Sequence, residues 1–112
     1  MLPKANRLVK ESEFKKVAKR AKPVHSNFLI LKKLPNPNQV TAFGIVISTK
    51  VSKKAVVRNK IRRRIREILR IHLNEVMPGF KVMLVVKNTI LDKDYQAIKV
   101  DLEALLKKVR LL

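Results

Sequence analysis

The stretch VVRNKIRRRIREILR, residues 56–70, decides the fold, because the rest of the chain must supply a core for it. Seven of its fifteen residues are Lys or Arg and one is acidic. Apolar residues recur in it at spacings of three and four, which predicts an amphipathic helix over about residues 55–76. The apolar stripe consists of Val57, Ile61, Ile65, Ile68 and Leu69. We expect this stripe to pack on a core while the opposite face points outward.

The outer face of the predicted helix is an arginine surface. Arg62, Arg66 and Arg70 follow one another at spacings of four. Like charges at this spacing oppose helix formation, by about 1–2 kcal/mol for the whole set. A surface that only has to be soluble mixes both signs of charge, whereas phosphates of a nucleic acid neutralise a face of one sign. The pattern therefore favours a phosphate-binding face over a solvated one.

Composition points the same way. The chain has 112 residues, which predicts one domain, and 46% of them are hydrophobic, which argues against disorder. Lys and Arg number 27 against 8 acidic residues, a formal net charge of +19. Such a surface attracts polyanions. Nucleic acid is the leading class of partner, and an anionic membrane surface is second.

The sequence has no Cys, which excludes a disulfide framework and any metal site that uses Cys. The first ten residues, MLPKANRLVK, contain no apolar stretch typical of a signal peptide. The longest apolar runs, such as residues 82–86, are too short to span a membrane. We therefore expect a soluble cytoplasmic protein with no membrane partner.

The remaining segments predict two more helices and three strands. Residues 81–87 are apolar on both faces, which predicts a central, covered strand, and Asp92 or Asp94 is expected to cap the last helix. The other predicted elements are a helix over residues 11–20 and strands over residues 27–34 and 40–49. The order α-β-β-α-β-α predicts an α/β (α+β) fold, a two-layer sandwich.

Groups for independent catalysis are lacking in the sequence. The acidic residues come mostly in pairs two apart, which on a helix point in different directions. His25 and His72 are interpreted as structural or surface residues, and no Gly-rich phosphate loop is present. The sequence therefore predicts a binding protein. Of its few aromatic residues, Phe14 and Phe28 are the best candidates for stacking on single-stranded bases.

The stretch FGIVISTKVSKKAVVRNKIRRRIRE, residues 43–67, resembles the signature of the protein subunit of bacterial ribonuclease P. The N-terminal NRLVKESEFKKV, the strand VMLVVK and the pair Asp94-Tyr95 are also similar to that family. The matching signature residues are Ser48, Lys50, Ala55, Val56, Arg58, Asn59, Lys60, Arg62, Arg63, Arg66 and Glu67.

This resemblance covers nearly the whole chain and implies one RNA-binding domain over residues 1–112. It implies that an RNA partner carries the active site and, with Mg²⁺, removes the 5′ leader of precursor tRNA. The protein would then be an enzyme only as part of the ribonuclease P holoenzyme, a ribonucleoprotein endonuclease and hydrolase, with no further protein partner required. The family fold also implies a left-handed β-α-β crossover, against the general right-handed rule.

The resemblance assigns no catalytic residue and no metal ligand to the protein itself. It implies RNA contacts from the basic loop and helix, at Lys50, Lys53, Lys54, Arg58, Asn59, Lys60, Arg62, Arg63, Arg66 and Arg70. It also implies a leader cleft between the first helix and the open face of the sheet. The expected cleft residues are Phe14, Ala18, Phe28, Ile30, Lys32, Val46 and Ser48.

Two cleft positions depart from the family pattern: Ala18 and Lys32 stand where many members have an aromatic residue. We therefore expect the cleft to hold the leader mainly through charge.

The alternative function is a basic ribosomal or RNA-chaperone protein with no role in cleavage. A nuclease acting without RNA, a DNA-binding module and a membrane-surface protein are weaker alternatives.

Overall fold

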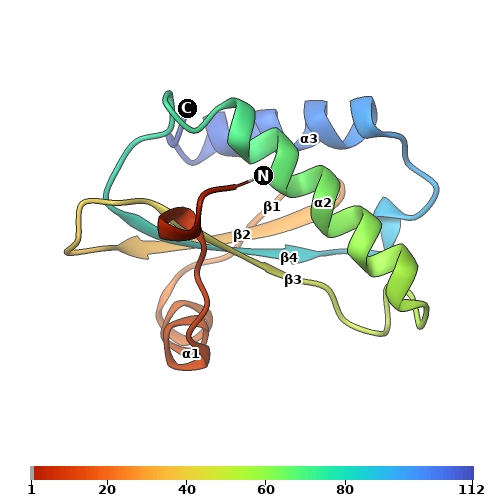
Figure 1. The fold of residues 1–112 in the computed structure, drawn as a ribbon, viewed down its shortest axis with the longest axis horizontal. Coiled ribbons are helices and arrows are strands. Elements are labelled where there is room, and N and C mark those ends of the chain that lie inside the picture. The colour runs from red at the N-terminus through yellow and green to blue at the C-terminus, as the bar shows by residue number, and fades with distance from the viewer. Residues whose placement is uncertain (1) are drawn as a thin grey trace.

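The computed structural model describes residues 2–112 and contains a four-stranded sheet with helices on both sides (Figure 1). The elements, in chain order, are η1 (Lys4–Asn6), α1 (Glu11–Arg20), β1 (Val24–His25), β2 (Leu29–Pro35), β3 (Ala42–Val46), α2 (Ala55–Ile71), β4 (Phe80–Val86), η2 (Asn88–Ile90) and α3 (Tyr95–Lys108). The mixed α+β class and the positions of all six predicted elements are confirmed.

The strand order in the sheet is β1-β2-β4-β3. Strand β4 is central, antiparallel to β2 and parallel to β3. Its residues Val82 and Leu84 are 0% exposed on one face, and Met83 is 5% exposed on the other. The prediction of a central strand is confirmed, but the strand is fully covered on one face only, because Val85 on the other face is half-buried.

Helix α2 connects the parallel neighbours β3 and β4. In Figure 1 both strands run from left to right, β3 lies nearer the viewer than β4, and α2 passes above them. This path has a left-handed sense, as the resemblance implied and contrary to the common right-handed crossover.

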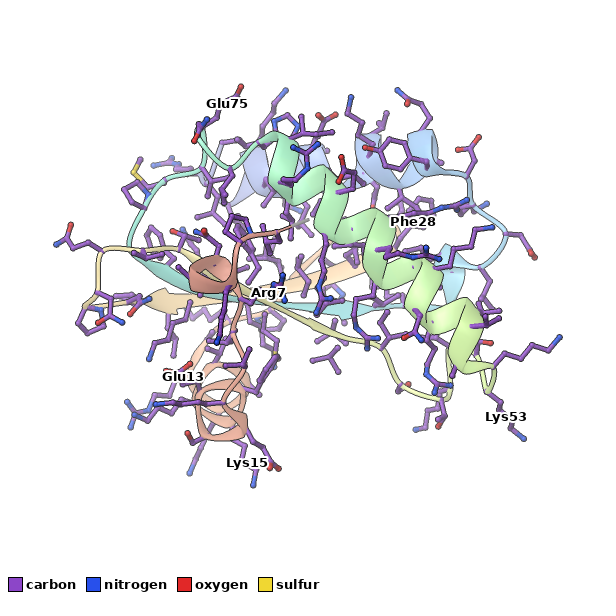
Figure 2. The ribbon with its side chains drawn as sticks, in the orientation of Figure 1. Arg7, Glu13, Lys15, Phe28, Lys53 and Glu75 are labelled. Carbon is purple, nitrogen blue, oxygen red and sulfur yellow. The ribbon has the colours of Figure 1, made fainter. Side chains whose placement is uncertain are left out.

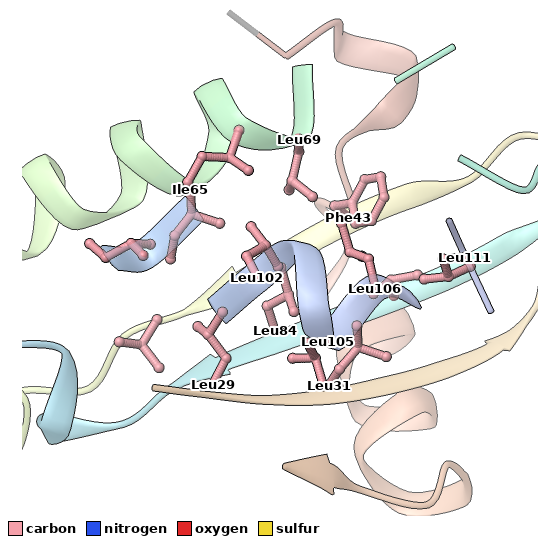
Figure 3. Close-up of a cluster of buried hydrophobic side chains, with 14 of the residues drawn as sticks. Leu29, Leu31, Phe43, Ile65, Leu69, Leu84, Leu102, Leu105, Leu106 and Leu111 are labelled. Carbon is pink, nitrogen blue, oxygen red and sulfur yellow. The ribbon is translucent and has the colours of Figure 1, made fainter. Parts of the chain in front are cut away.

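Helices α2 and α3 cover one face of the sheet and enclose the core (Figure 3). Ile65 from α2, Leu102 from α3 and Leu84 from β4 are each 0% exposed. Fully burying one such side chain contributes about 1.5–3 kcal/mol. The sheet and these two helices form the expected two-layer sandwich. Helix α1 lies against the opposite face, near β2 and β4, and adds a partial third layer (Figure 2).

Two element ends differ from the sequence prediction, and one strand was not predicted. Helix α2 ends at Ile71 and not at residue 76, because the next residues form a turn in which His72 bonds Glu103 of α3 through Nε2 at 2.5 Å. A two-residue strand, β1, was not predicted, since two residues carry no periodic pattern. Strand β3 ends at Val46, earlier than predicted.

The entry into β2 also differs, because Asp101 of α3 fixes it. This carboxylate is 7% exposed and accepts hydrogen bonds from Ser26 Oγ at 2.6 Å and from the backbone N–H groups of Asn27 and Phe28 at 3.0 Å each. The chain bends at Asn27 and Phe28, so β2 begins at Leu29 rather than at residue 27. Asp94, one of the two predicted caps, accepts from Ala97 N at 2.8 Å at the start of α3.

Within residues 2–112, no helix combines the length and the apolar character needed to cross a lipid bilayer.

Candidate nucleic-acid interface

Helix α2 presents its charges as the sequence predicted. Its apolar stripe is buried, with Ile65, Ile68 and Leu69 at 0% exposed. The predicted RNA-binding residues of the helix fall into two groups, exposed and half-buried. The exposed ones are Asn59, Lys60, Arg63 and Arg70, and the half-buried ones are Arg58, Arg62 and Arg66. The half-buried group lies at spacings of four along one flank of the helix, where Arg62 adjoins Ile45 and Val46 of β3, and the exposed group forms the outer surface.

The basic loop before α2 is held in place by the chain itself. Val51 is buried at 5% exposed, and its N–H donates to the carbonyl of Ser48 at 3.0 Å. Arg58 Nη1 donates to the carbonyl of Ser52 at 2.8 Å, so this arginine braces the loop. The predicted cations Lys50, Lys53 and Lys54 are exposed on this loop, at the amino end of α2, where the helix dipole also attracts anions.

Most of these cations are not neutralised by the protein. In the part of the chain that the structure describes, Lys53, Lys54, Lys60 and Arg63 make no ion pair with a carboxylate. Arg70 is the exception, since it bonds both carboxylate oxygens of Glu67.

Pairing between Arg70 and Glu67 shifts the pKa of each group in the direction that favours its charged form. The hydrogen bond from Arg70 lowers the pKa of Glu67, and the same bond raises the pKa of Arg70. Both side chains are therefore charged at neutral pH, and this pair removes one arginine of the helix from the unneutralised set.

Arg7 lies next to this surface, although no sequence pattern assigned it to the basic patch. The N-terminal segment runs beside the edge strand β3. Arg7 forms an isolated parallel β-bridge with Phe43, and Leu8 N donates to the carbonyl of Phe43 at 2.8 Å. The position of Arg7 is marked in Figure 2. Partial burial, together with the positive charges of Arg7 and Arg62, lowers the pKa of Arg66. No sequence periodicity links residues 7 and 66, so only long-range strand pairing could reveal this neighbour.

A cleft of about 650 Å³ lies between α1 and the face of the sheet that α2 and α3 leave open. Three predicted leader residues, Phe14, Ala18 and Val46, line it together with the predicted phosphate-binding Arg62. The further lining residues are Val9, Glu11, Lys15, Ile45, Ile47, Met83 and Val85. Arg62 thus belongs both to the basic helix and to the cleft.

Ile30 and Lys32 lie on the same face of the sheet as the cleft, because they pair with Val85 and Met83 in the register of β2 and β4. Neither of them lines the cleft itself. Lys32 Nζ donates to the carbonyl of Ala18 at 3.0 Å, close to the carboxyl end of α1, where a cation also complements the helix dipole. This lysine therefore fastens α1 to the sheet.

Two expected cleft residues lie elsewhere. Phe28 packs against the core beside α3, where it adjoins Ala97 and Val100, because the bend fixed by Asp101 interrupts the alternation of β2. The prediction that Phe28 faces the cleft was wrong. Ser48 follows the end of β3, and its Oγ accepts from Lys50 N at 3.2 Å, so it shapes the basic loop instead of the cleft.

Phe14 contacts Gly44 at the centre of the cleft face. A Cβ atom added at Gly44 would lie 2.3 Å from Phe14 Cε1 and 3.2 Å from Leu8 Cβ. The absence of a side chain at Gly44 thus allows the ring to lie against β3, and this contact sets how closely α1 approaches the sheet.

Metal-binding groups are not gathered in the described chain: no set of three or more His, Cys, Asp or Glu residues in it could hold a metal ion.

A mixed sheet with one face closed by two helices, and with a cleft beside a largely unneutralised basic helix on the other, defines a small α+β protein with a strongly positive surface. The family model for ribonuclease P matches residues 2–110. The chain belongs to the ribonuclease P protein family. It is therefore a protein subunit of an endoribonuclease that works in tRNA processing.

Individual relatives agree with this assignment. The chain is 38% identical to the ribonuclease P protein component of Rippkaea orientalis, over 99% of this chain and 91% of that one. It is 34% identical to that of Caldanaerobacter subterraneus subsp. tengcongensis, over 99% and 95% of the two chains.

Solved structures show the same fold. The RNase P protein of Staphylococcus aureus superimposes with a TM-score of 0.89 at 27% identity, covering 96% of this chain and 98% of that one. The RNase P protein of Thermotoga maritima gives 0.83 at 25% identity, covering 91% and 96%. The family expected from residues 43–67 is confirmed, against the alternative of a ribosomal or RNA-chaperone protein.

Proposed function

We propose that this single domain binds the RNA subunit of ribonuclease P through α2 and its basic loop, and binds the 5′ leader of precursor tRNA in the cleft. In this proposal the RNA carries the active site and the protein positions the substrate. The observation that carries it is the place of Arg62, which lines the cleft and also belongs to the cationic flank of α2. One RNA surface can therefore meet the helix while a second strand passes beside it.

The cleft suits a single strand of RNA. Its floor is apolar, formed by residues such as Ile45, Val46 and Val85, with the ring of Phe14 beside them. Arg62 supplies positive charge at its border, and Lys15 is a second cation there, in an exposed ion pair with Glu11 at 3.5 Å. A single strand can lay its bases on the apolar floor and its phosphates against the cations. Lys32 donates to the carbonyl of Ala18 in α1, so it supplies less charge to the cleft than the sequence predicted. We propose that apolar contacts with the leader add to its binding by charge.

Because residues 2–112 contain no cluster of three or more His, Cys, Asp or Glu that could hold a metal ion, we assign no step to a metal bound by side chains. We propose that Mg²⁺ is held by phosphates of the RNA, which are hard oxygen ligands of the kind that Mg²⁺ prefers. The contribution of the protein is electrostatic: cations between two RNA strands lower the repulsion that Mg²⁺ would otherwise have to screen. We further propose that the protein acts in the cytoplasm, where it needs no second protein.

Reconstituted cleavage tests the proposal. The protein and its cognate RNA subunit are combined at low Mg²⁺ with precursor tRNA carrying either a long leader or a single leader nucleotide. We expect the protein to accelerate cleavage, and Arg62→Ala to slow cleavage of the long-leader substrate more than that of the short one. Lys107→Ala, which removes an exposed charge from the far end of α3, is the matched control.

Two outcomes would contradict the proposal. Equal loss on both substrates would mean that Arg62 does not meet the leader. No acceleration by the wild-type protein would favour a role in RNA folding without cleavage. Binding to the RNA subunit over a range of salt concentrations gives an independent measure, since each lost phosphate contact lowers the log–log slope by about 0.7–0.9.

A further inference from the structure

A second groove lies between the first half of α2 and the connection from η2 to α3. Its volume is about 420 Å³, within the range of roughly 300–1,000 Å³ found for small-ligand sites. Lys60 and Arg64 line one wall and Lys93 lines the other. We propose that this groove binds one unstacked nucleotide of the RNA subunit, whose phosphate meets these three cations. The inference rests on the proposed function, because it supplies a second contact for the same RNA.

The groove is on the other side of α2 from the cleft. Arg62 lines the cleft and Arg64 lines the groove, and two residues apart on a helix means about 200° around its axis. The outer surface between them carries Asn59 and Arg63, both exposed. An RNA backbone that crosses α2 at this level therefore meets Asn59 and Arg63 between the cleft and the groove.

The walls of the groove are joined by a hydrogen bond, and their cations are not neutralised by ion pairs. Arg64 Nη1 donates to the carbonyl of Lys93 at 3.0 Å, which joins α2 to the opposite wall. Within the described chain none of the three cations forms an ion pair with a carboxylate. Lys93 Nζ lies 5.8 Å from the centroid of the Phe28 ring, a long contact that its flexible side chain can exchange for a phosphate.

The floor of the groove distinguishes a nucleotide from a phosphate alone. Val57 is half-buried and Leu91 is 37% exposed, so both present apolar surface to the groove, above the buried Ile61 and Ile90. A free phosphate gains nothing from such a floor, whereas a nucleobase covers apolar surface and removes it from water. One nucleotide with its base turned out of the stack matches both parts of the groove.

An acidic side chain at the border indicates which bases fit. Asp92 is exposed beside the groove and has a φ of 64°, in the left-handed region that Asp tolerates better than most residues. Carboxylates accept hydrogen bonds from exocyclic amino groups such as that of cytosine. The neighbouring Asp94 already bonds Ala97 N as the cap of α3. The groove therefore favours a base that carries an amino group.

The first test compares two double variants in binding to the cognate RNA subunit over a range of salt concentrations. Arg64→Gln with Lys93→Gln removes two groove charges and keeps a polar side chain at both positions. Lys107→Gln with Lys108→Gln removes the same charge from an exposed site at the end of α3. We expect the groove variant to lose about tenfold in affinity for the RNA subunit, and its log–log salt slope to fall by the amount that one to two phosphate contacts contribute. The control variant should lose about twofold in affinity or less.

Equal losses in the two double variants would overturn the inference, because net charge alone would then explain them. Circular dichroism of both proteins checks that they are folded. Arg62→Ala separates this result from the proposed function. If Arg62→Ala weakens binding to the RNA subunit and the groove variant does not, the groove is not a nucleotide site and the proposed function stands. If neither variant weakens binding, both the nucleotide site and the proposed function are wrong.

Leu91→Ser tests the base. We expect about a threefold loss of affinity for the RNA subunit with an unchanged salt slope, because the lost contact is uncharged. An unchanged affinity would mean that only a phosphate occupies the groove, which overturns the assignment of a nucleotide. As a direct readout, Leu91→Cys introduces a single thiol into a chain without Cys. A photo-crosslinker on this thiol should react with one short RNA segment, whereas diffuse crosslinking would contradict a specific site.

Discussion

Strand β4 presents alternate residues to two different environments. Val82 and Leu84 lie under α2 and α3 and are 0% exposed. Met83 and Val85 face α1 and line the cleft. The two sets are equally apolar, so their chemistry does not say which face is the core. The difference teaches that an apolar strand face can serve either as packing surface or as the floor of a binding site, depending on what covers it.

The largest expected effect separates these two faces directly. Leu84→Ala leaves a cavity in the enclosed core and should lower the free energy of unfolding by about 3–4 kcal/mol. Val85→Ala removes less volume from a face with free space beside it, and should cost about 1 kcal/mol or less. Urea denaturation of both variants measures this. Similar losses would mean that the cleft face is packed as tightly as the core.

A second variant tests the hydrogen bonds of Asp101, which fix the start of β2 and so determine which side chains near it face the core. Asp101→Ala removes the acceptor for Ser26 Oγ and for the N–H groups of Asn27 and Phe28. Leaving buried donors unsatisfied should destabilise the protein by about 2–3 kcal/mol. Asp101→Asn keeps one side-chain acceptor and should lose less. If the alanine and asparagine variants are equally stable, the bend before β2 does not depend on this carboxylate.

The cleft face has its own close contact, and Gly44→Ala would disturb it. The new Cβ would collide with the Phe14 ring, and overpacking of this kind should cost about 1–2 kcal/mol. The ring should move into the cleft, so binding of long leaders should weaken as well. In the double variant Phe14→Ala/Gly44→Ala the collision is absent. We expect its loss of stability to be smaller than the sum of the single losses; an additive result would show that the contact does not position α1.

The smallest effect is expected on the outer surface of α2, which belongs to neither face of the sheet. The bond from Arg70 lowers the pKa of Glu67 in the folded protein. Its contribution to stability is therefore complete above the pKa of the unfolded chain, about 4.3, and is lost as the pH falls through the lower pKa of the folded state.

Glu67→Gln should accordingly be slightly less stable than the wild type at neutral pH and equally stable in strong acid. Thermal unfolding at both pH values measures the difference, and the same small deficit at both would show that the carboxylate charge is not involved. The variant should also bind RNA somewhat more tightly at low salt, because Arg70 is no longer paired.

Much of the fold could be read from local patterns. The period of residues 57–69 placed α2 and its buried stripe, and the uninterrupted apolar run of residues 82–86 placed the central strand. The charge excess and the motif around Arg58 and Asn59 pointed to RNA and to the family. These signals depend on residues close together in the chain, whose spacing sets which side of a helix or strand they occupy.

Long-range contacts decided the details of the site. Phe28 was expected in the cleft and lies beside α3, because a carboxylate 73 residues away bends the chain before β2. Lys32 fastens the end of α1 through Ala18, and Arg7 reaches the α2 surface through its bridge to Phe43. The composition and spacing of this chain thus establish its elements, its positive helix and its family. Which residues share a cleft follows from pairings between distant segments, because their geometry exists only after the sheet and helices have packed.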